Sequence, residues 1–245
     1  MERSRRQARR LQANVKEQLL TASDDPATHV HPKPRLRGRL HQGALFVVVP
    51  AGVVLVALAR TAAARTVALI YAASVISVYA VSTAYHRLSW GPRMARWMKR
   101  ADHSMIYVLI AGTTTPFAVL ALRPPWSFVL LAIVWVGAGV GIATKVIRVD
   151  GFAALSGTLY ITLGWSSLVF IPEFLHHMSV ATLVLVLVGG LLYTGGALVF
   201  QRGRPNPAPA TFGYHEIWHS CVIAATACHW VAVLLLVLPA RPAIT

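Results

Sequence analysis

Residues 213–238 read GYHEIWHSCVIAATACHWVAVLLLVL and contain no Asp, Lys or Arg and a single Glu. The stretch exceeds the ~20 apolar residues with which a helix crosses the hydrocarbon of a bilayer. Its first turns contain H-E-x-x-H, formed by His215, Glu216 and His219. In this pattern two histidines share one helix face and can bind one metal ion. We therefore predict a membrane-spanning helix with candidate metal ligands at its start.

Six more apolar segments precede this one, and together they predict an all-α, seven-transmembrane helix bundle. Only 13% of the 245 residues are charged, against about 25% in soluble domains. The runs lack the polar alternation of membrane-spanning strands. The first is short, and we expect it to extend back through Leu40 and His41. The seven segments cover residues 44–59, 66–86, 104–122, 126–144, 152–171, 180–200 and 213–238.

The basic residues fall on one side of this arrangement and predict its orientation. Of the 23 Lys and Arg residues, 19 lie in the tail and in alternate connections, and four lie on the other side. Positive charge marks the cytoplasmic side of membrane proteins, so the N-terminus is predicted inside and the C-terminus outside. The 19 occupy residues 1–43, 87–103, 145–151 and 201–212.

This pattern predicts that the chain has two parts. Residues 1–43 are predicted to form a basic cytoplasmic tail with a pre-helix segment, and residues 44–240 a seven-transmembrane domain. The net charge of +15 is explained by these topology signals, and nucleic acid is not an expected partner. We expect a multi-pass protein of the plasma membrane.

Polar side chains from three predicted spans meet at one membrane depth. Ser82 and His86 end the second span, Asp102 begins the third, and His215 and His219 begin the seventh. The three histidines supply the ligand set of a catalytic zinc ion. Asp102 could hold or deprotonate the water that zinc activates, and Ser82 could donate a hydrogen bond to water, to Asp102 or to a substrate oxygen.

Simpler interpretations exist for several of these residues. Asp102 could be an interfacial carboxylate neutralised by Lys99 or Arg100. His103, next to Asp102 in sequence, is expected to face away from it. His229 lies about 15 Å further along its helix by helical rise and is too deep to reach the same metal.

Four stretches in this order resemble the hemolysin III proteins of bacteria, which are relatives of the progestin and adiponectin receptors. The resemblance covers nearly everything after residue 30. The stretches are HPKPRLRGRLH (31–41), STAYH (82–86), ADHSMIY (101–107) and FGYHEIWHS (212–220).

The resemblance implies a zinc ion near the cytoplasmic face, held by His86, His215 and His219. It also maps the family's aspartate onto Asp102 and its serine onto Ser82. The receptor branch is linked to hydrolysis of amide-linked lipids such as ceramide. The family's histidine before the first span maps onto His41, for which the sequence suggests no role.

H-E-x-x-H on a helix is also typical of zinc metalloproteases, in which the glutamate is the base. That interpretation is disfavoured here. The receptor relatives have Gln where this chain has Glu216, and few residues follow His219 to supply a third ligand. Glu216 is expected to pair with Arg202 or Arg204.

Three functions stay open on the sequence alone. The first is a zinc-dependent, ceramidase-like hydrolase of lipid amide or ester bonds, with membrane lipids as partners and substrates. The second is a receptor or sensor in which zinc is structural. The third is a pore-forming, cytolytic protein, although the middle of most spans is nearly devoid of charge. The sequence predicts neither the natural substrate nor the oligomeric state.

Overall fold

The computed structural model describes residues 34–151 and 153–238, with the side chains of 153 and 154 excepted. The residues from Pro34 onward belong to one compact unit. The predicted cytoplasmic tail lies largely outside the described residues, and its boundary at residue 43 stays a prediction.

The described chain is all-helical and contains seven helices or helix groups long and apolar enough to span a membrane, which confirms the predicted architecture. The protein is therefore a multi-pass membrane protein. In chain order the elements are α2 (Arg39–Leu58), α3 (Ala62–Arg87), α4 (Pro92–Ala121), α5 (Trp126–Ile147), α6 (Ala153–Trp165), η1 (Ser166–Phe170), α7 (Ile171–His177), α8 (Val180–Arg202) and α9 (Tyr214–Val237).

Three helix boundaries lie outside the predicted apolar segments, because a helix can continue into polar residues at either end of a span. α2 begins at Arg39, so the first span does extend back through His41. α4 begins at Pro92 rather than near residue 104, since proline at a first helical position leaves no backbone bond unmade. The fifth span consists of α6, η1 and α7, and its helical path continues to His177 rather than ending near residue 171.

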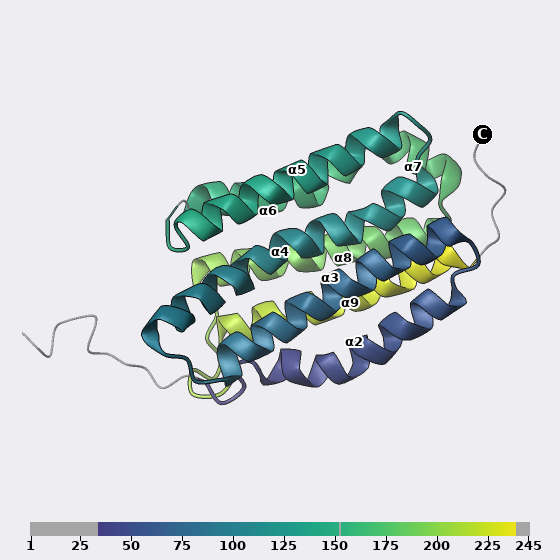
Figure 1. Cartoon of the computed structure of the whole chain (residues 1–245). Helices are drawn as coiled ribbons and strands as arrows, with labels where there is room; N and C mark the ends of the chain where they lie inside the picture. The colour runs from purple at the N-terminus through teal and green to yellow at the C-terminus, as the bar shows by residue number, and fades with distance from the viewer. Residues whose placement is uncertain (1–33, 152, 239–245) are drawn as a thin grey trace, which may run out of the picture. The chain divides into compact units, whose positions relative to one another are not determined.

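The bundle keeps its polar and small side chains inside. α9 packs against α2, α3, α4 and α8 (Figure 1), and α4 is the most buried of the seven spans. Large apolar side chains point outward instead; Phe46, for example, is 79% exposed. Exposed apolar surface on this scale is unfavourable in water and matches the hydrocarbon of a bilayer.

The close packing of α3 on α4 depends on one small residue. A Cβ added to Gly112 would lie 2.3 Å from the Ser74 hydroxyl oxygen. Ser74 is buried and donates its hydroxyl hydrogen to the Tyr71 carbonyl, 2.7 Å away. Small residues let membrane helices approach this closely, and the approach sets the lateral position of α4 beside α3.

One end of the bundle collects the functional candidates. α3, α5 and α8 finish there, and α2, α4, α6 and α9 begin there. Contacts across this end include the backbone bonds Arg35 N–H to Ala210 O (3.0 Å) and Leu36 N–H to Thr211 O (3.2 Å). We call it the histidine end.

Candidate metal centre

Three histidines converge where α3 ends and α9 begins. One ring nitrogen from each of His86, His215 and His219 lies within 4.8 Å of the others, and these three form a group that can hold a metal ion. Their ring centroids lie 4.6 to 5.5 Å apart. The three ligands predicted from the sequence are therefore brought together.

The donor set fits a transition metal. Zinc binds imidazole nitrogen at about 2.0–2.1 Å, so small side-chain rotations would let all three rings serve one ion. Three protein nitrogens leave a fourth position for water or substrate, which is the arrangement of catalytic zinc sites. Among the described residues no other group of histidine, cysteine or carboxylate side chains meets the same criterion.

A fourth histidine supports this cluster from α2. The His41 ring stacks on the His219 ring with centroids 3.8 Å apart and planes inclined by 4°. His41 is buried and also contacts the Tyr79 ring at 4.7 Å. The stacking restricts the rotation of the His219 ring and so helps to aim its nitrogen.

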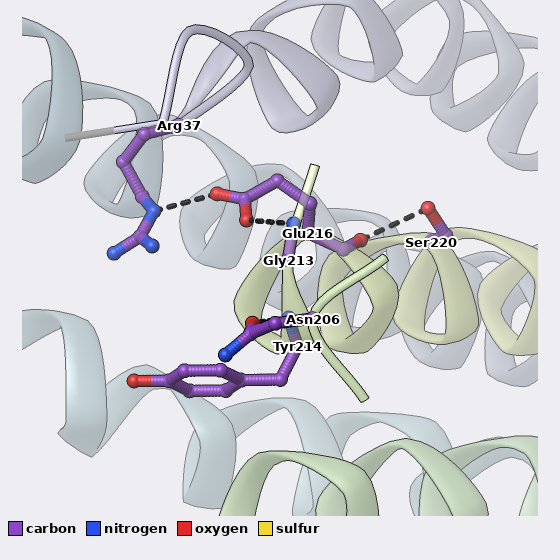
Figure 2. Close-up of polar contacts among 6 residues, drawn as sticks. All are labelled: Arg37, Asn206, Gly213, Tyr214, Glu216 and Ser220. Carbon is purple, nitrogen blue, oxygen red and sulfur yellow. Dashed lines mark hydrogen bonds and ion pairs between the residues drawn. The ribbon is translucent and has the colours of Figure 1, made fainter. Parts of the chain in front are cut away.

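The carboxylate of the H-E-x-x-H motif takes no part in the cluster. Figure 2 shows Glu216 turned toward Arg37, whose Nε donates to Glu216 Oε1 at 2.6 Å. The second oxygen, Oε2, accepts the Gly213 backbone N–H at 2.9 Å. The expected partners Arg202 and Arg204 are thus wrong, because the strap before α2 reaches Glu216 instead.

These bonds remove Glu216 as a candidate base and make it a structural residue. Its side chain is only 1% exposed, and both oxygens are engaged, one of them in capping the first turn of α9. A carboxylate at this position also interacts favourably with the positive end of the helix dipole. The Tyr214 N–H donates to Asn206 Oδ1 (3.0 Å) and Ser220 Oγ to the Glu216 carbonyl (3.0 Å), as Figure 2 also shows.

The strap formed by residues 34–38 passes directly over the site. Gly38 has φ of 75°, which other residues rarely adopt, and a Cβ there would lie 2.6 Å from Cβ of His86. The Arg37 side chain reaches α9 from the same strap. The strap therefore contacts both helices that carry the candidate ligands, α3 through Gly38 and α9 through Arg37.

Asp102 and Ser82 line the same cavity as His215 and His219. Ser82 is buried, and its side chain lies close enough to the Asp102 carboxyl group to interact with it. The expectation that His103 faces away is wrong: its Nδ1 lies 3.7 Å from Asp102 Oδ2. That nitrogen donates to the Lys99 carbonyl at 2.9 Å, so the ring is held beside Asp102.

A cavity of about 770 Å³ connects this polar end to the interior of the bundle. Its wall includes Ser82, Asp102, His215 and His219 at the histidine end, and Phe174 and Met178 toward the opposite end. Apolar side chains make up most of the wall between. A cavity of this size and character suits a ligand with a long apolar chain.

His229, expected to be too deep for the metal, lies outside the group of three. Its Nε2 donates to the Val186 carbonyl at 3.3 Å, and its ring packs against Gly189 of α8. His229 therefore joins α8 to α9.

The sequence missed three residues near the site: His41 as a packing partner of His219, Arg37 as the partner of Glu216, and Lys145, which lines the cavity. For His41 a signal was available, since the first turn of the first span lies at the depth of the other histidines. For Arg37 and Lys145 only the packing of distant segments supplies the information.

Comparison with known proteins supports this architecture. The Haemolysin-III related family matches residues 29–230. The chain is 36% identical to Hemolysin-3 of Bacillus cereus over 179 residues, which cover 73% of this chain and 78% of that protein. It is 34% identical to the Hemolysin-3 homolog of Bacillus subtilis (strain 168) over 165 residues, or 67% and 74% of the two chains.

A more distant relative comes from animals. The human monocyte to macrophage differentiation factor is 25% identical over 173 residues, covering 69% of each chain. No solved structure shows significant similarity.

The cluster predicts a measurable metal content. Protein purified without chelators should contain about one equivalent of transition metal per chain. His86→Ala and His219→Ala should each lose most of it, because two ligands hold an ion far less well than three. Mass-spectrometric metal analysis checks this, with His176→Ala on the exposed end of α7 as the matched control. Metal retained in both site variants would contradict the assignment.

The ion pair predicts coupled effects of Arg37 and Glu216. Arg37→Met should lower the free energy of unfolding in detergent by about 3 kcal/mol, because it leaves a buried carboxylate without its charged partner. In a Glu216→Gln background the same change should cost much less, since a neutral amide needs no counter-ion. Equal losses in both backgrounds would show that the pair is not coupled.

Proposed function

The chain belongs to the Haemolysin-III related family, and we propose that it is a membrane hydrolase that uses zinc to cleave lipid amide or ester bonds. The observation that carries the proposal is the cavity. It joins an apolar space of lipid-chain size to Asp102, Ser82 and two of the three clustered histidines. A lipid with its chain in the cavity would present its polar linkage to these groups.

Zinc is the metal that this donor set favours. Three neutral imidazoles with an open position are typical of hydrolytic zinc sites. When bound there, zinc would supply Lewis-acid chemistry, which makes water a better nucleophile and polarises a carbonyl group. His86, His215 and His219 would hold it, and His41 would orient His219 by stacking.

The protein side chains would manage the protons. Asp102 takes a proton from the attacking water as its oxygen bonds to the carbonyl carbon of the lipid. When the carbon–nitrogen or carbon–oxygen bond breaks, Asp102 gives that proton to the leaving amine or alkoxide. The products are a fatty acid and an amine or alcohol. Ser82, which lies close to Asp102, would orient this carboxyl group and could also donate to the developing oxyanion.

The protein would act at the cytoplasmic face of the plasma membrane. The excess of Lys and Arg in the segments at the histidine end supports this orientation by the positive-inside rule. Substrates would then be lipids that reach the inner leaflet.

The activity predicts a distinctive phenotype for Asp102→Asn. We expect this variant to fold and to retain its metal, but to lose at least ~100-fold in hydrolysis of N-acyl amides, because proton transfer is lost. Ser82→Ala should lose about 5- to 10-fold, the value of one hydrogen bond. Turnover of a panel of lipid amides and esters by zinc-loaded protein in nanodiscs provides the measurement.

A control variant and two contrary outcomes complete this experiment. Glu216→Gln should keep most activity, because Glu216 caps a helix and is not a base. If Asp102→Asn loses its metal or unfolds, the site is structural, as in a receptor or sensor. Wild-type protein with one equivalent of zinc and no turnover of any lipid would refute the proposed activity.

Orientation is tested by labelling from outside the cell. In a Cys221→Ser, Cys228→Ser background, Arg204→Cys lies exposed at the histidine end and His176→Cys lies exposed at the other end. A membrane-impermeant maleimide should label only His176→Cys in intact cells and both variants after permeabilisation. Labelling of only Arg204→Cys in intact cells would reverse the orientation.

A further inference from the structure

Lys145 is a buried cation in the wall of the cavity. It lies in the last turn of α5, its side chain is only 5% exposed, and it lines the same cavity as Asp102, His215 and His219. No hydrogen bond or ion pair joins it to another residue in the part of the chain that the structure describes. Ionisable groups at such positions are costly, and in membrane proteins they mark functional sites by default.

The nearest carboxylates have other partners. Asp150, after the end of α5, forms an ion pair with Lys99 and is 75% exposed. The hydrogen bond from Lys99 holds the pKa of the Asp150 carboxyl below its ordinary value, so this residue is ionised and committed to Lys99. Asp102 lies beside His103 and Ser82, and no ion pair joins it to Lys145. Among the described residues, Lys145 is thus attracted to Asp150 from a distance, but no carboxylate is in direct contact with it.

Ordinary roles for a lysine near a helix end do not account for its burial. A snorkelling lysine lays its stem on apolar surface and keeps its ammonium group in water, which leaves more than 5% of the side chain exposed. A lysine in a last turn also interacts with the helix dipole. That interaction is available equally to an exposed side chain and gives no reason to face the cavity.

Two further polar side chains line the cavity together with Lys145. Ser156, a buried hydroxyl in α6, and His103 line the same cavity. Lys145 and His103 lie near enough to interact electrostatically, and His103 is 3.7 Å from Asp102. A negatively charged group bound by Lys145 would thus lie on the Asp102 side of the site, close to the bond that is cleaved.

We propose that Lys145 binds a carboxylate on the amine side of the substrate, so that the preferred substrates are N-acyl amino acids. This inference rests on the proposed hydrolase function. The apolar cavity takes the acyl chain, the amide lies between Asp102 and the three histidines, and the carboxylate pairs with Lys145. One buried ammonium matches the single charge of a carboxylate. In the reaction, water adds its oxygen to the acyl carbon, the carbon–nitrogen bond breaks, and the amino acid leaves with the transferred proton on nitrogen.

A matched pair of lipids tests the charge alone. N-oleoylglycine and N-oleoylethanolamine share their acyl chain and amide bond and differ in a carboxylate against a hydroxyl. Zinc-loaded wild-type protein should prefer N-oleoylglycine by about 10-fold in kcat/KM. Lys145→Met should lower kcat/KM for N-oleoylglycine about 10- to 30-fold, mostly through KM, as expected for one charge-assisted hydrogen bond. The kcat/KM for N-oleoylethanolamine should change less than about 2-fold, because this lipid has no carboxylate for Lys145 to bind.

The controls separate this role from a structural one. Lys145→Arg should retain the preference, and Arg96→Met, which removes an exposed cation of α4, should affect both lipids alike. Lys145→Met should unfold at the same temperature as wild type or higher, because it removes a buried charge. An equal loss of kcat/KM for both lipids in Lys145→Met would overturn the inference. Lys145 would then act on the fatty-acid carboxylate, which is a product of both reactions.

Equilibrium binding of the two lipids, measured by native mass spectrometry, separates the inference from the hydrolase proposal. If neither lipid is hydrolysed but wild type prefers N-oleoylglycine and Lys145→Met does not, the hydrolase proposal fails and the carboxylate site stands. If both lipids are hydrolysed and bound equally well by wild type, the hydrolase stands and the carboxylate site is refuted.

Discussion

The buried Glu216 carboxylate ties the histidine end together. Through Gly213 it fixes the first turn of α9, and through Arg37 it fixes the strap that precedes α2. α9 carries two of the three clustered histidines, and α2 carries the ring that stacks on one of them. Loss of both of these bonds, rather than of the charge alone, would therefore shift ligands contributed by distant parts of the chain at the same time.

The same bonds explain why the glutamate of the H-E-x-x-H motif has a structural role here rather than that of a base. H-E-x-x-H defines where two imidazoles lie on a helix, because residues four apart share a face. It does not define where the intervening glutamate points. In this protein that side chain reaches the strap and the helix cap, and the carboxylate that the proposed mechanism uses is Asp102 from another helix.

The bilayer imposes the second constraint on the site. Exposed side chains along the spans are apolar, so ionisable groups concentrate inside or at the ends of the bundle. A cavity among them brings an apolar compartment into contact with Asp102, Lys145 and the histidines. An amphiphile matches such a space, because one part needs an apolar wall and the other needs hydrogen-bond donors.

The sequence by itself predicted the seven spans and the convergence of His86, His215 and His219, which the structure bears out. Hydropathy and helical spacing are local properties, and short connections force consecutive spans to alternate in direction. Only the tertiary structure decided the partner of Glu216, the stacking of His41 on His219 and the burial of Lys145. These depend on the rotation of each helix about its axis and on the path of the strap. Both are set by packing between segments far apart in the chain, which no local pattern encodes.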